Sequence, residues 1–376
     1  MNILLNAITF TKHTSGANQR FIGLYGEFIR QNPKLNFFIY QPRDCNISFH
    51  GSLDLKNIFF INSSVSSETS SFIKFFMSLF DLRNILIKKK IDIYEGYSLP
   101  FFQFYKSKKI LTIHDIRDFY YAYSGNFLRF LVYKVILFIS IKSANYIIAV
   151  SNTSKKELLR HYPNSKISVV YNGIDKKLFD KITEIDLKKI KNKYFLPKYF
   201  LLSVGHFEKR KNYKRLIDAF NVIKKNDKKQ HLVLVGKKNQ EVKKLKDQIT
   251  ALNLDKSVLI INSASDFEIR CIYKLSNIFV SPSLYEGFGI PVLEAMAAKV
   301  PFVLSDIDVF KEITNNEGLY FDPENTDSIT NKILYLINND YEKKRLIKYA
   351  EKRINDFDFN QLTFNLKKLY KKIDSL

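Results

Sequence analysis

Cysteine, tryptophan and glycine are scarce in this chain of 376 residues, which has two Cys, no Trp and 12 Gly. Cys45 and Cys271 lie too far apart in the sequence to suggest a disulfide framework or a Cys-based zinc site, which fits a protein of the reducing cytoplasm. Glycine falls below half of its usual share of about 7%, so any local gathering of glycine is informative.

Long apolar runs are also missing. The longest stretch without Asp, Glu, Lys or Arg is the 12 residues 143–154, short of the about 18 apolar residues that span a bilayer. The start of the chain, MNILLNAITF, has no basic lead-in before its apolar residues, and it predicts a first buried strand rather than a signal peptide. We therefore expect no membrane-spanning segment.

Four catalytic and nucleotide-binding motifs are absent, namely the P-loop, Gly-x-Gly-x-x-Gly, His-Glu-x-x-His and Gly-x-Ser-x-Gly. Their absence argues against P-loop NTPases, dinucleotide enzymes, zincins and α/β-hydrolases. The chemistry has to be sought in other combinations of residues.

Acidic residues are outnumbered by basic ones, and the formal net charge is +23. Residues 1–195 contain 29 Lys and Arg against 14 Asp and Glu, whereas residues 196–376 contain 31 against 23, so the first half is the more basic. An anionic membrane, a nucleic acid, or a phosphorylated substrate in a lysine-rich proteome would each explain this excess.

Short apolar runs alternate with longer helical patterns, which is typical of α/β folds with parallel sheets. The predicted strands are residues 2–6, 37–41, 58–62, 91–94, 110–113, 146–150 and 168–171, then 199–204, 231–235, 258–261, 278–281 and 302–304. We predict two Rossmann-like domains that face each other across a cleft, at 1–193 and 194–358, and a helix at 359–376 that packs back on the first domain.

Two helical segments of the first half could lie on a membrane surface. Residues 72–90 combine Phe and Leu with a terminal Lys88-Lys89-Lys90 triplet, and residues 127–142 are more apolar still. Both patterns also fit ordinary helices that pack on a parallel sheet, so the two explanations stay open.

Residues 281–306 contain the most candidate functional residues, and here a predicted strand is followed by a glycine turn and a helix. Gly287 and Gly289 lie in the turn, and Pro291 suits the first turn of the helix. The free N–H groups of such a helix start favour anionic ligands at the carboxyl end of the strand. Glu286 and Glu294 bracket this turn, and both could bind hydroxyl groups of one ligand.

Three further positions follow predicted strands. Gly205 permits a turn after residues 199–204, and Arg210 and Lys211 then precede a helix and suit a diphosphate. His114 ends the strand at 110–113, where it can enter a cleft between the domains. Gly16 lies in the loop 11–18 that leads from the first strand into the first helix.

The segment Glu286-Gly-Phe-Gly-Ile-Pro-Val-Leu-Glu294 resembles the Glu-x7-Glu motif of the retaining glycosyltransferases of family 4, which have the GT-B fold. The segments at 148–151, 170–175, 204–212 and 112–115 support this resemblance, and it extends over nearly the whole chain. The Arg-Lys-Asn sequence at 210–212 is similar to that of bacterial surface-polysaccharide mannosyltransferases, which suggests GDP-mannose as donor.

The resemblance implies roles for individual residues. Glu294 would bind the ribose and Glu286 the transferred sugar, while Lys211 and Arg210 would neutralise the departing diphosphate. His114 would contact the donor sugar. The backbone of the turn would contact the sugar and the diphosphate, and the implied substrate-binding residues are Gly287, Phe288, Gly289, Ile290, Gly205 and Gly16. No metal ion is expected, since Lys and Arg can supply the charge that Mg²⁺ supplies elsewhere.

We therefore predict a hexosyltransferase that uses a GDP-, UDP- or dTDP-linked sugar and a lipid-linked or lipopolysaccharide acceptor, on the cytoplasmic face of the inner membrane. Two alternatives remain at this point. A nucleotide-sugar 2-epimerase has a similar two-domain plan, and a basic protein that binds nucleic acid would explain the charge.

Overall fold

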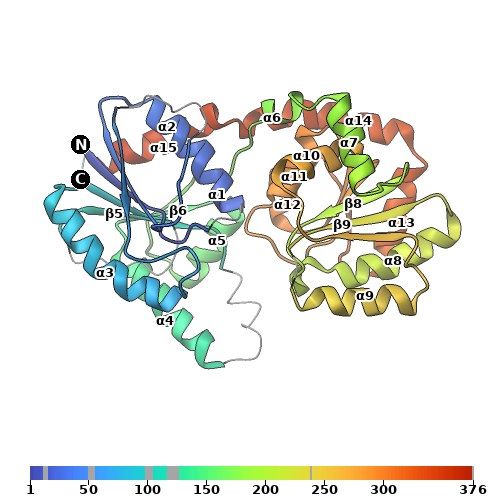
Figure 1. Cartoon of the computed structure of the whole chain (residues 1–376), viewed down its shortest axis with the longest axis horizontal. Helices are drawn as coiled ribbons and strands as arrows, with labels where there is room; N and C mark the ends of the chain where they lie inside the picture. Colours follow the sequence, from blue (N-terminus) through green and yellow to red (C-terminus); the bar gives the residue numbers. More distant parts are fainter. Residues whose placement is uncertain (12–15, 50–55, 98–104, 117–126, 238, 375–376) are drawn as a thin grey trace. The chain divides into compact units, whose positions relative to one another are not determined.

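The computed structural model describes residues 1–376 apart from 12–15, 50–55, 98–104, 117–126, 238 and 375–376. The chain forms two units, each built on its own sheet (Figure 1). The first comprises Met1–Gly173 and Phe359–Leu376, and the second comprises Ile174–Asp358. Every described strand pair is parallel, as the alternation of strands and helices predicts.

The first sheet has seven strands in the order β3-β2-β1-β4-β5-β6-β7. The strands are β1 (Asn2–Asn6), β2 (Asn36–Gln41), β3 (Ile58–Asn62), β4 (Ile93–Gly96), β5 (Lys108–Ile113), β6 (Tyr146–Ala149) and β7 (Ile167–Val169). This is the doubly wound Rossmann order, in which the chain reverses its direction of winding between β1 and β4.

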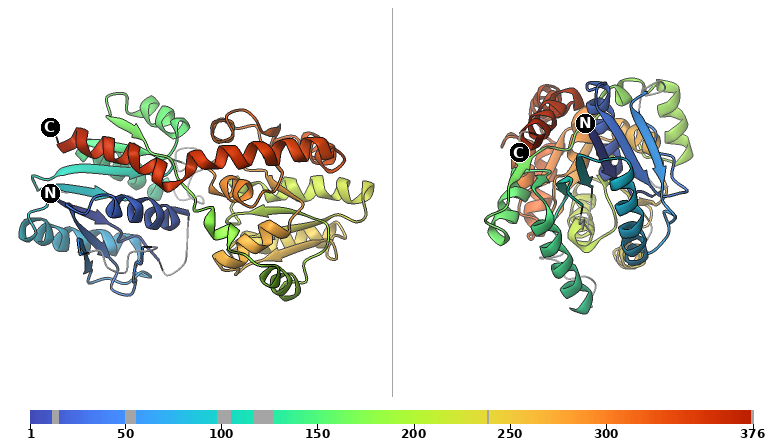
Figure 2. Two further views of the ribbon diagram at one scale, coloured as in Figure 1. Left: turned by 90° about the horizontal axis from the view of Figure 1, so that it is seen from above. Right: turned by 90° about the vertical axis from the view of Figure 1, so that its left-hand side faces the viewer.

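Helices cover both faces of this sheet, and apolar side chains from the sheet and the helices form one core on each face. The helices are α1 (Gly16–Arg20), the π-helical turn η1 (Phe21–Tyr25), α2 (Gly26–Arg30), α3 (Ser71–Lys88), α4 (Phe127–Ser143), α5 (Asn152–His161) and α15 (Phe359–Asp374). Helix α15 packs against α2 and η1, and Figure 2 shows it beside this part of the chain.

The second sheet has six strands in the order β10-β9-β8-β11-β12-β13, with its reversal between β8 and β11. The strands are β8 (Phe200–Val204), β9 (His231–Val235), β10 (Val258–Ile261), β11 (Ile278–Ser281), β12 (Phe302–Ser305) and β13 (Leu319–Phe321). Strands buried on both faces read as continuous apolar runs, which is why most of them could be located in the sequence.

In the second unit, helices again alternate with strands along the chain (Figure 1). They are α6 (Lys177–Asp180), α7 (Glu184–Lys193), the 3₁₀ turn η3 (Lys209–Lys211), α8 (Tyr213–Asn226), α9 (Glu241–Ala251), α10 (Asp266–Leu275), α11 (Ile290–Ala297), α12 (Asp308–Ile313), α13 (Thr326–Ile337), α14 (Asp340–Arg353) and the 3₁₀ turn η4 (Ile354–Phe357). Among the described helices, none combines the length and the apolar character that crossing a bilayer requires.

The first unit ends at Gly173, twenty residues before the boundary expected at 193. The expected boundary relied on the charged, turn-rich composition of the preceding segment. That segment instead contains α6 and α7, and α7 packs against α10 of the second unit through the buried Ile190. The final helix, α15, belongs to the first unit.

Two local features differ from the sequence-based expectations. The strand β13 was not anticipated, because it has only three residues and two of them are half-buried. The Ser154-Lys-Lys-Glu157 sequence has the pattern of a capping box and predicts a helix that begins at Ser154, but helix α5 begins at Asn152, and its cap is the Ser151 hydroxyl, which accepts a hydrogen bond from the Ser154 N–H.

Candidate active site

The carboxyl ends of β8 and β11 bring two distant segments of the second unit together. The two strands are direct neighbours, with Leu201 opposite Ile278 and Leu202 opposite Phe279. The segment with Arg210 and Lys211 follows β8, and the segment with Glu286 and Gly289 follows β11. Both predicted segments therefore lie at the reversal point of the sheet, where ligands bind in folds of this kind.

Glu286 is the centre of a buried cluster of charges at this point. Its Oε2 accepts a hydrogen bond from Arg210 Nη1 at 2.8 Å, and its Oε1 accepts one from Lys211 Nζ. The Ser283 hydroxyl donates to the same Oε1 at 2.8 Å. The Glu286 and Lys211 side chains are each 9% exposed, so water contributes little to their solvation.

The backbone fixes Arg210 against the segment after β11. The Leu284 N–H donates to the Arg210 carbonyl at 2.7 Å, and Arg210 Nη1 donates to the Tyr285 carbonyl at 3.1 Å. Arg210 Nε donates to Glu208 Oε2 at 2.7 Å. Arg210 is thus held by two carboxylates and the main chain, whereas the three N–H donors of Lys211 have one described acceptor, the Glu286 carboxylate.

The electrostatics of Glu286 follow from this arrangement. Burial alone would raise the pKa of its carboxyl, but the charges of Lys211 and Arg210 outweigh burial and lower the pKa to about 2. The carboxylate is therefore ionised at every physiological pH. It holds both cations in place without titrating.

Gly205 allows Lys211 to approach the end of β8. Its φ of +152° is a conformation that residues with a side chain rarely adopt, and an added Cβ would lie 3.0 Å from Lys211 Cε and 3.0 Å from Lys211 Nζ. The Gly205 carbonyl accepts a hydrogen bond from the Tyr213 hydroxyl at 3.0 Å. A side chain at this position would displace the Lys211 ammonium.

Helix α11 begins at Ile290, directly after the glycine turn. Gly289 is its N-cap with a φ of +111°, and this residue has no side chain that could cap the helix. An added Cβ at Gly289 would lie 2.8 Å from Phe310 Cε1. The N-terminus of α11 thus directly follows the segment that holds Glu286, and it carries the partial positive charge of a helix start.

The side chain of Phe288 is part of the hydrophobic core. It is buried, and its ring lies 6.0 Å from the Phe357 ring in an edge-to-face arrangement. Only its backbone can therefore take the ligand-binding role that the resemblance implies. The preceding Gly287 has no side chain, so the same holds for it.

Glu294 lies one turn inside α11 and is partly exposed. Burial raises the pKa of its carboxyl to about 7, although a hydrogen bond with Tyr273 acts in the opposite direction. The charge of Lys211 also acts on this carboxyl, so Glu294 and Lys211 lie within electrostatic reach of one another. The Tyr273 hydroxyl donates to the Pro291 carbonyl at 3.2 Å, which ties it to the start of α11.

His114 and Gly16 belong to the first unit, at the carboxyl edge of its sheet. Burial, and next the charge of Arg20, lowers the pKa of His114 to about 3, so its imidazole is neutral. Its Nε2 is buried and has no hydrogen-bond partner among the described residues. The His114 ring contacts the Tyr97 ring edge-to-face at 4.8 Å.

A buried network of hydrogen bonds around Arg20 and Tyr97 lies next to His114. Arg20 is fully buried and donates to the Tyr97 hydroxyl at 3.4 Å and to the Val170 carbonyl at 3.3 Å. The Tyr97 hydroxyl in turn donates to the Ala17 carbonyl at 2.8 Å, next to Gly16. The network therefore positions both the His114 ring and the start of α1. Residues 12–15, which belong to the loop 11–18, and residues 98–104, which follow β4 in the sequence, lie outside the described residues.

Several of these residues gave no signal in the sequence. Ser283, Glu208 and Tyr273 are ordinary residue types in loops and helices, and their contacts with Glu286, Arg210 and Glu294 depend on the fold. Asn262 follows β10, and its Oδ1 is buried without a described partner.

The described residues contain no group of three His, Cys, Asp or Glu side chains placed to hold a metal ion. An Asp-x-Asp triplet, Asp306-Ile307-Asp308, does follow β12. Asp306 forms an ion pair with Lys311, and Asp308 lies in the first turn of α12.

Two protein-family models match the chain. Residues 59–178 match the model described as "Glycosyltransferase Family 4", and residues 184–353 match the one described as "Glycosyl transferases group 1". Together they cover parts of both units, including the segments around Lys211, Glu286 and Glu294.

Curated relatives agree with these matches. The O-antigen chain mannosyltransferase RfbU of Salmonella typhimurium is 30% identical over 272 residues, which is 71% of each chain. The O-antigen chain mannosyltransferase B of Escherichia coli is 28% identical over 205 residues, or 54% of each chain. Neither the epimerase nor the nucleic-acid-binding alternative is supported by these matches.

Solved structures confirm the predicted GT-B fold. Sucrose-phosphate synthase from Thermosynechococcus elongatus superposes with a TM-score of 0.77 at 17% identity, over 100% of this chain and 99% of that one. Anabaena HepE, solved in complex with UDP and glucose, superposes with a TM-score of 0.73 at 18% identity over 100% of both chains. The family models, the relatives and the fold together place the chain in family 4 of the glycosyltransferases.

Proposed function

We propose that this glycosyltransferase moves a hexose, mannose, from a nucleotide diphosphate sugar to a bacterial surface glycan or its lipid-linked precursor, with retention of the anomeric configuration. The names of its relatives support the sugar and the acceptor class, since RfbU and its Escherichia coli counterpart are O-antigen chain mannosyltransferases. The solved HepE complex with UDP and glucose supports a nucleotide sugar as donor.

The observation that carries this proposal is the cluster of Lys211, Arg210 and Glu286, whose segment leads directly into the N-terminus of α11. A helix N-terminus favours an anion, and Lys211 offers further N–H donors beside it. The diphosphate of the donor gains negative charge as its bond to the sugar breaks. Fixed positive groups at that place therefore stabilise the transition state more than the bound substrate.

Each site residue has a role in this account. Glu294 accepts hydrogen bonds from the ribose hydroxyls, and Glu286 orients Lys211 and Arg210 and borders the transferred sugar. The backbone of residues 287–290 and Gly205 contacts the sugar and the diphosphate. Lys211 and Arg210 supply the positive charge, so the reaction is proposed to proceed without a bound metal ion.

The first unit contributes the neutral His114 and the backbone at Gly16. The Nε2 of His114 has no hydrogen-bond partner among the described residues, and in this proposal it binds a hydroxyl of the donor sugar. In the reaction, the bond between C1 and the phosphate oxygen breaks as the acceptor oxygen bonds to C1 on the same face. The acceptor proton passes to the departing phosphate, so no protein nucleophile is needed.

The test of this function is a transfer assay in which the purified chain is given a lipid-linked glycan acceptor together with GDP-mannose, UDP-glucose or dTDP-glucose, with and without EDTA. We expect release of nucleoside diphosphate from GDP-mannose, unchanged by EDTA, and an α-linked product by NMR. Formation of an epimerised nucleotide sugar, a β-linked product, or a strict need for added metal would contradict the proposal.

The pKa of Glu294 predicts how donor binding depends on pH. Above about pH 7 the carboxylate accepts the ribose hydroxyls, and below it protonation removes one acceptor, so the affinity for GDP-mannose should fall as the pH is lowered through about 7. A nucleotide sugar suits this measurement, because its diphosphate does not titrate in this range. Calorimetry between pH 5.5 and 8.5 measures it, and Glu294→Gln should bind weakly with a flat profile.

The raised pKa of Glu294 also predicts how the stability of the folded chain depends on pH. The folded chain holds the Glu294 proton more tightly than the unfolded chain, so the contribution of Glu294 to the free energy of unfolding should fall as the pH rises from about 4.5 to about 7. Glu294→Gln should remove this slope and melt at a higher temperature than the natural chain at pH 8. A variant that melts lower at pH 8 would contradict the raised pKa.

Attachment to an anionic membrane surface is part of the proposal. Along α3, Ile73, Met77, Phe80 and Ile87 are exposed, with Phe80 at 75%. On α4 the exposed apolar side chains are Leu131, Val132, Val135, Phe138 and Ile139. Lysines lie next to these side chains. Lys88 is the last residue of α3, and Lys89 and Lys90 follow it. On α4, Lys134 lies over the Phe130 ring and Lys142 over the Phe138 ring. Apolar side chains flanked by lysines are typical of helices that lie on anionic bilayers.

Phe80→Glu should weaken binding to vesicles of phosphatidylglycerol and phosphatidylcholine by more than tenfold, since a buried Phe contributes about 1.5–3 kcal/mol. Cosedimentation measures this. Phe364→Glu is the matched control, because Phe364 is 70% exposed on α15, outside both helices. Equal losses in the two variants, or none in Phe80→Glu, would argue against α3 as a membrane contact.

A further inference from the structure

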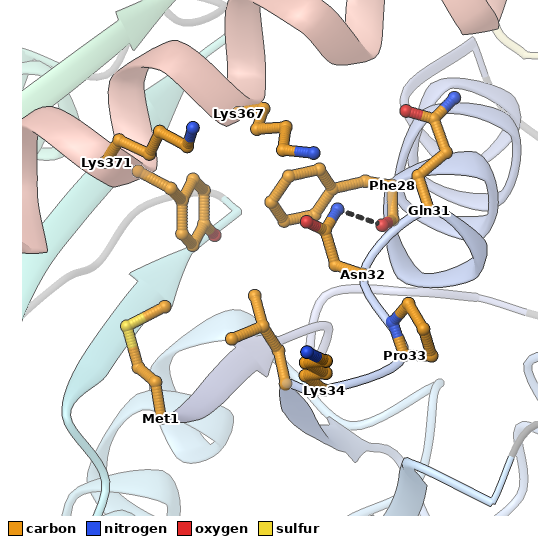
Figure 3. A pocket seen from close by; sticks show the side chains of 10 residues that line it. Met1, Phe28, Gln31, Asn32, Pro33, Lys34, Lys367 and Lys371 are labelled. Carbon is orange, nitrogen blue, oxygen red and sulfur yellow. Dashed lines mark hydrogen bonds between the residues drawn. The ribbon is translucent and has the colours of Figure 1, made fainter.

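A pocket of about 380 Å³ opens in the first unit at the amino ends of β1 and β2 (Figure 3). Its walls come from α2, from the turn between α2 and β2, and from α15. His114 and Gly16 lie at the carboxyl edge of the same sheet, so the pocket is separate from the residues proposed to contact the donor sugar. None of the roles proposed above uses it.

Three lysines flank the opening of this pocket. Figure 3 shows Lys367 and Lys371 reaching from α15 on one side and Lys34 on the other. None of these ammonium groups has an ion pair or hydrogen bond with a described residue, and the described lining contains no Asp or Glu. Three unpaired positive charges around one cavity are complementary to an anion.

The remaining wall is mainly apolar. Phe28, Leu35 and Tyr370 line the pocket beneath the lysines. The Tyr370 hydroxyl points into the core, where it donates to the Glu95 carboxylate, so its ring is left for the pocket. Asn32 Nδ2 donates to the Phe28 carbonyl at 2.7 Å (Figure 3). This apolar part of the wall suits a hydrocarbon or aromatic group.

The pocket lies within a basic edge of the first sheet. Because the strands are parallel, the residues that start them share one edge, and β2 to β7 each have a lysine at their start or at most four residues before it. These lysines are Lys34, Lys56, Lys90, Lys108, Lys142 and Lys166. Lys108 Nζ donates to the Ile373 carbonyl at 2.7 Å, which brings the basic end of α15 to the same edge. This edge attracts anions towards the pocket.

We propose that the pocket binds a phosphate-headed amphiphile, with the phosphate held by Lys34, Lys367 and Lys371 and the apolar body against Phe28, Leu35 and Tyr370. A membrane lipid and a soluble phosphorylated molecule share this chemistry. The site does not depend on the proposed sugar transfer, and the full chain can be tested without a glycosyl donor.

The experiment measures binding of octyl phosphate by calorimetry, below its micellar concentration, with inorganic phosphate and octyl phosphocholine as comparisons. We expect octyl phosphate to bind saturably and more tightly than either. Lys367→Gln and Lys371→Gln should each weaken it by about tenfold, the effect of losing one hydrogen bond to a charged group. Lys368→Gln is the matched control, because Lys368 lies on the same helix outside the pocket, and it should change the affinity less than about twofold.

Four results would overturn the proposal: no saturable binding of octyl phosphate, equal binding of octyl phosphocholine, equal binding of inorganic phosphate, or equal weakening by Lys368→Gln. A second arm identifies the source. If Lys367→Gln and Lys371→Gln also weaken binding to vesicles that contain phosphatidic acid, the ligand is a lipid headgroup. If vesicle binding is unchanged while octyl phosphate binding falls, the ligand is a soluble phosphorylated molecule.

Discussion

Lys211→Met is expected to lower kcat/KM for sugar transfer by about a thousandfold, the effect of removing a preorganised donor to the charge that develops in a transition state. Methionine keeps the length of the side chain but has no charge to place near the departing diphosphate. The loss should fall mainly on kcat, because the charge on the diphosphate grows as the bond to the sugar breaks. Initial rates over a range of donor concentrations separate the two parameters.

A double variant separates this catalytic effect from stability. Lys211→Met leaves the buried Glu286 carboxylate with Arg210 and Ser283 alone, which should destabilise the chain, since breaking a buried ion pair costs up to about 3–5 kcal/mol. Adding Glu286→Gln removes the excess negative charge, so the double variant should regain much of its melting temperature but none of its activity. Recovery of activity in the double variant would mean that Lys211 has only a structural role.

Gly205→Ala is expected to lower activity by about tenfold without changing any charge, because the Lys211 ammonium has to shift by a few tenths of an ångström and a full ångström of misplacement can cost about a hundredfold. The added methyl group would lie 3.0 Å from both Lys211 Cε and Lys211 Nζ, so the ammonium has to move. The φ of +152° adds about 1–3 kcal/mol of backbone strain. Steady-state kinetics and thermal unfolding of the variant measure the two effects.

Gly318→Ala provides the matched control for Gly205→Ala. Its added Cβ would lie 2.8 Å from Tyr320 Cζ, in the same unit and at an ordinary φ, with Lys211 absent from its contacts. It should lose stability but keep its kcat. If both variants lose activity in proportion to stability, the position of Lys211 does not explain the effect.

Much of the fold could be predicted, because strands covered on both faces form apolar runs that stand out between polar helices. The segment from β11 to α11 was predictable for a related reason, since Gly289 and Pro291 are informative in a chain with so little glycine. The adjacency of Lys211 and Glu286 follows from the strand order, because β8 and β11 meet at the reversal point.

Other parts depend on contacts that no local pattern contains. The first unit ends at Gly173 because α7 packs on α10, and turn-rich composition gave no sign of that packing. Arginine usually lies at the protein surface, yet Arg20 is fully buried, where it contacts Tyr97 and its charge acts on His114. The lysines of the basic edge of the first sheet are scattered through the sequence, and they come together only because the strands are parallel.

The most direct test of the central claim, that the turn before α11 and the segment after β8 form one donor site, is calorimetric titration of the purified chain with GDP, UDP and dTDP. We expect one nucleoside diphosphate to bind saturably at one site per chain, and both Lys211→Met and Glu294→Gln to weaken it at least tenfold at pH 8. Full affinity in both variants, or no binding of any of the three, would contradict the account.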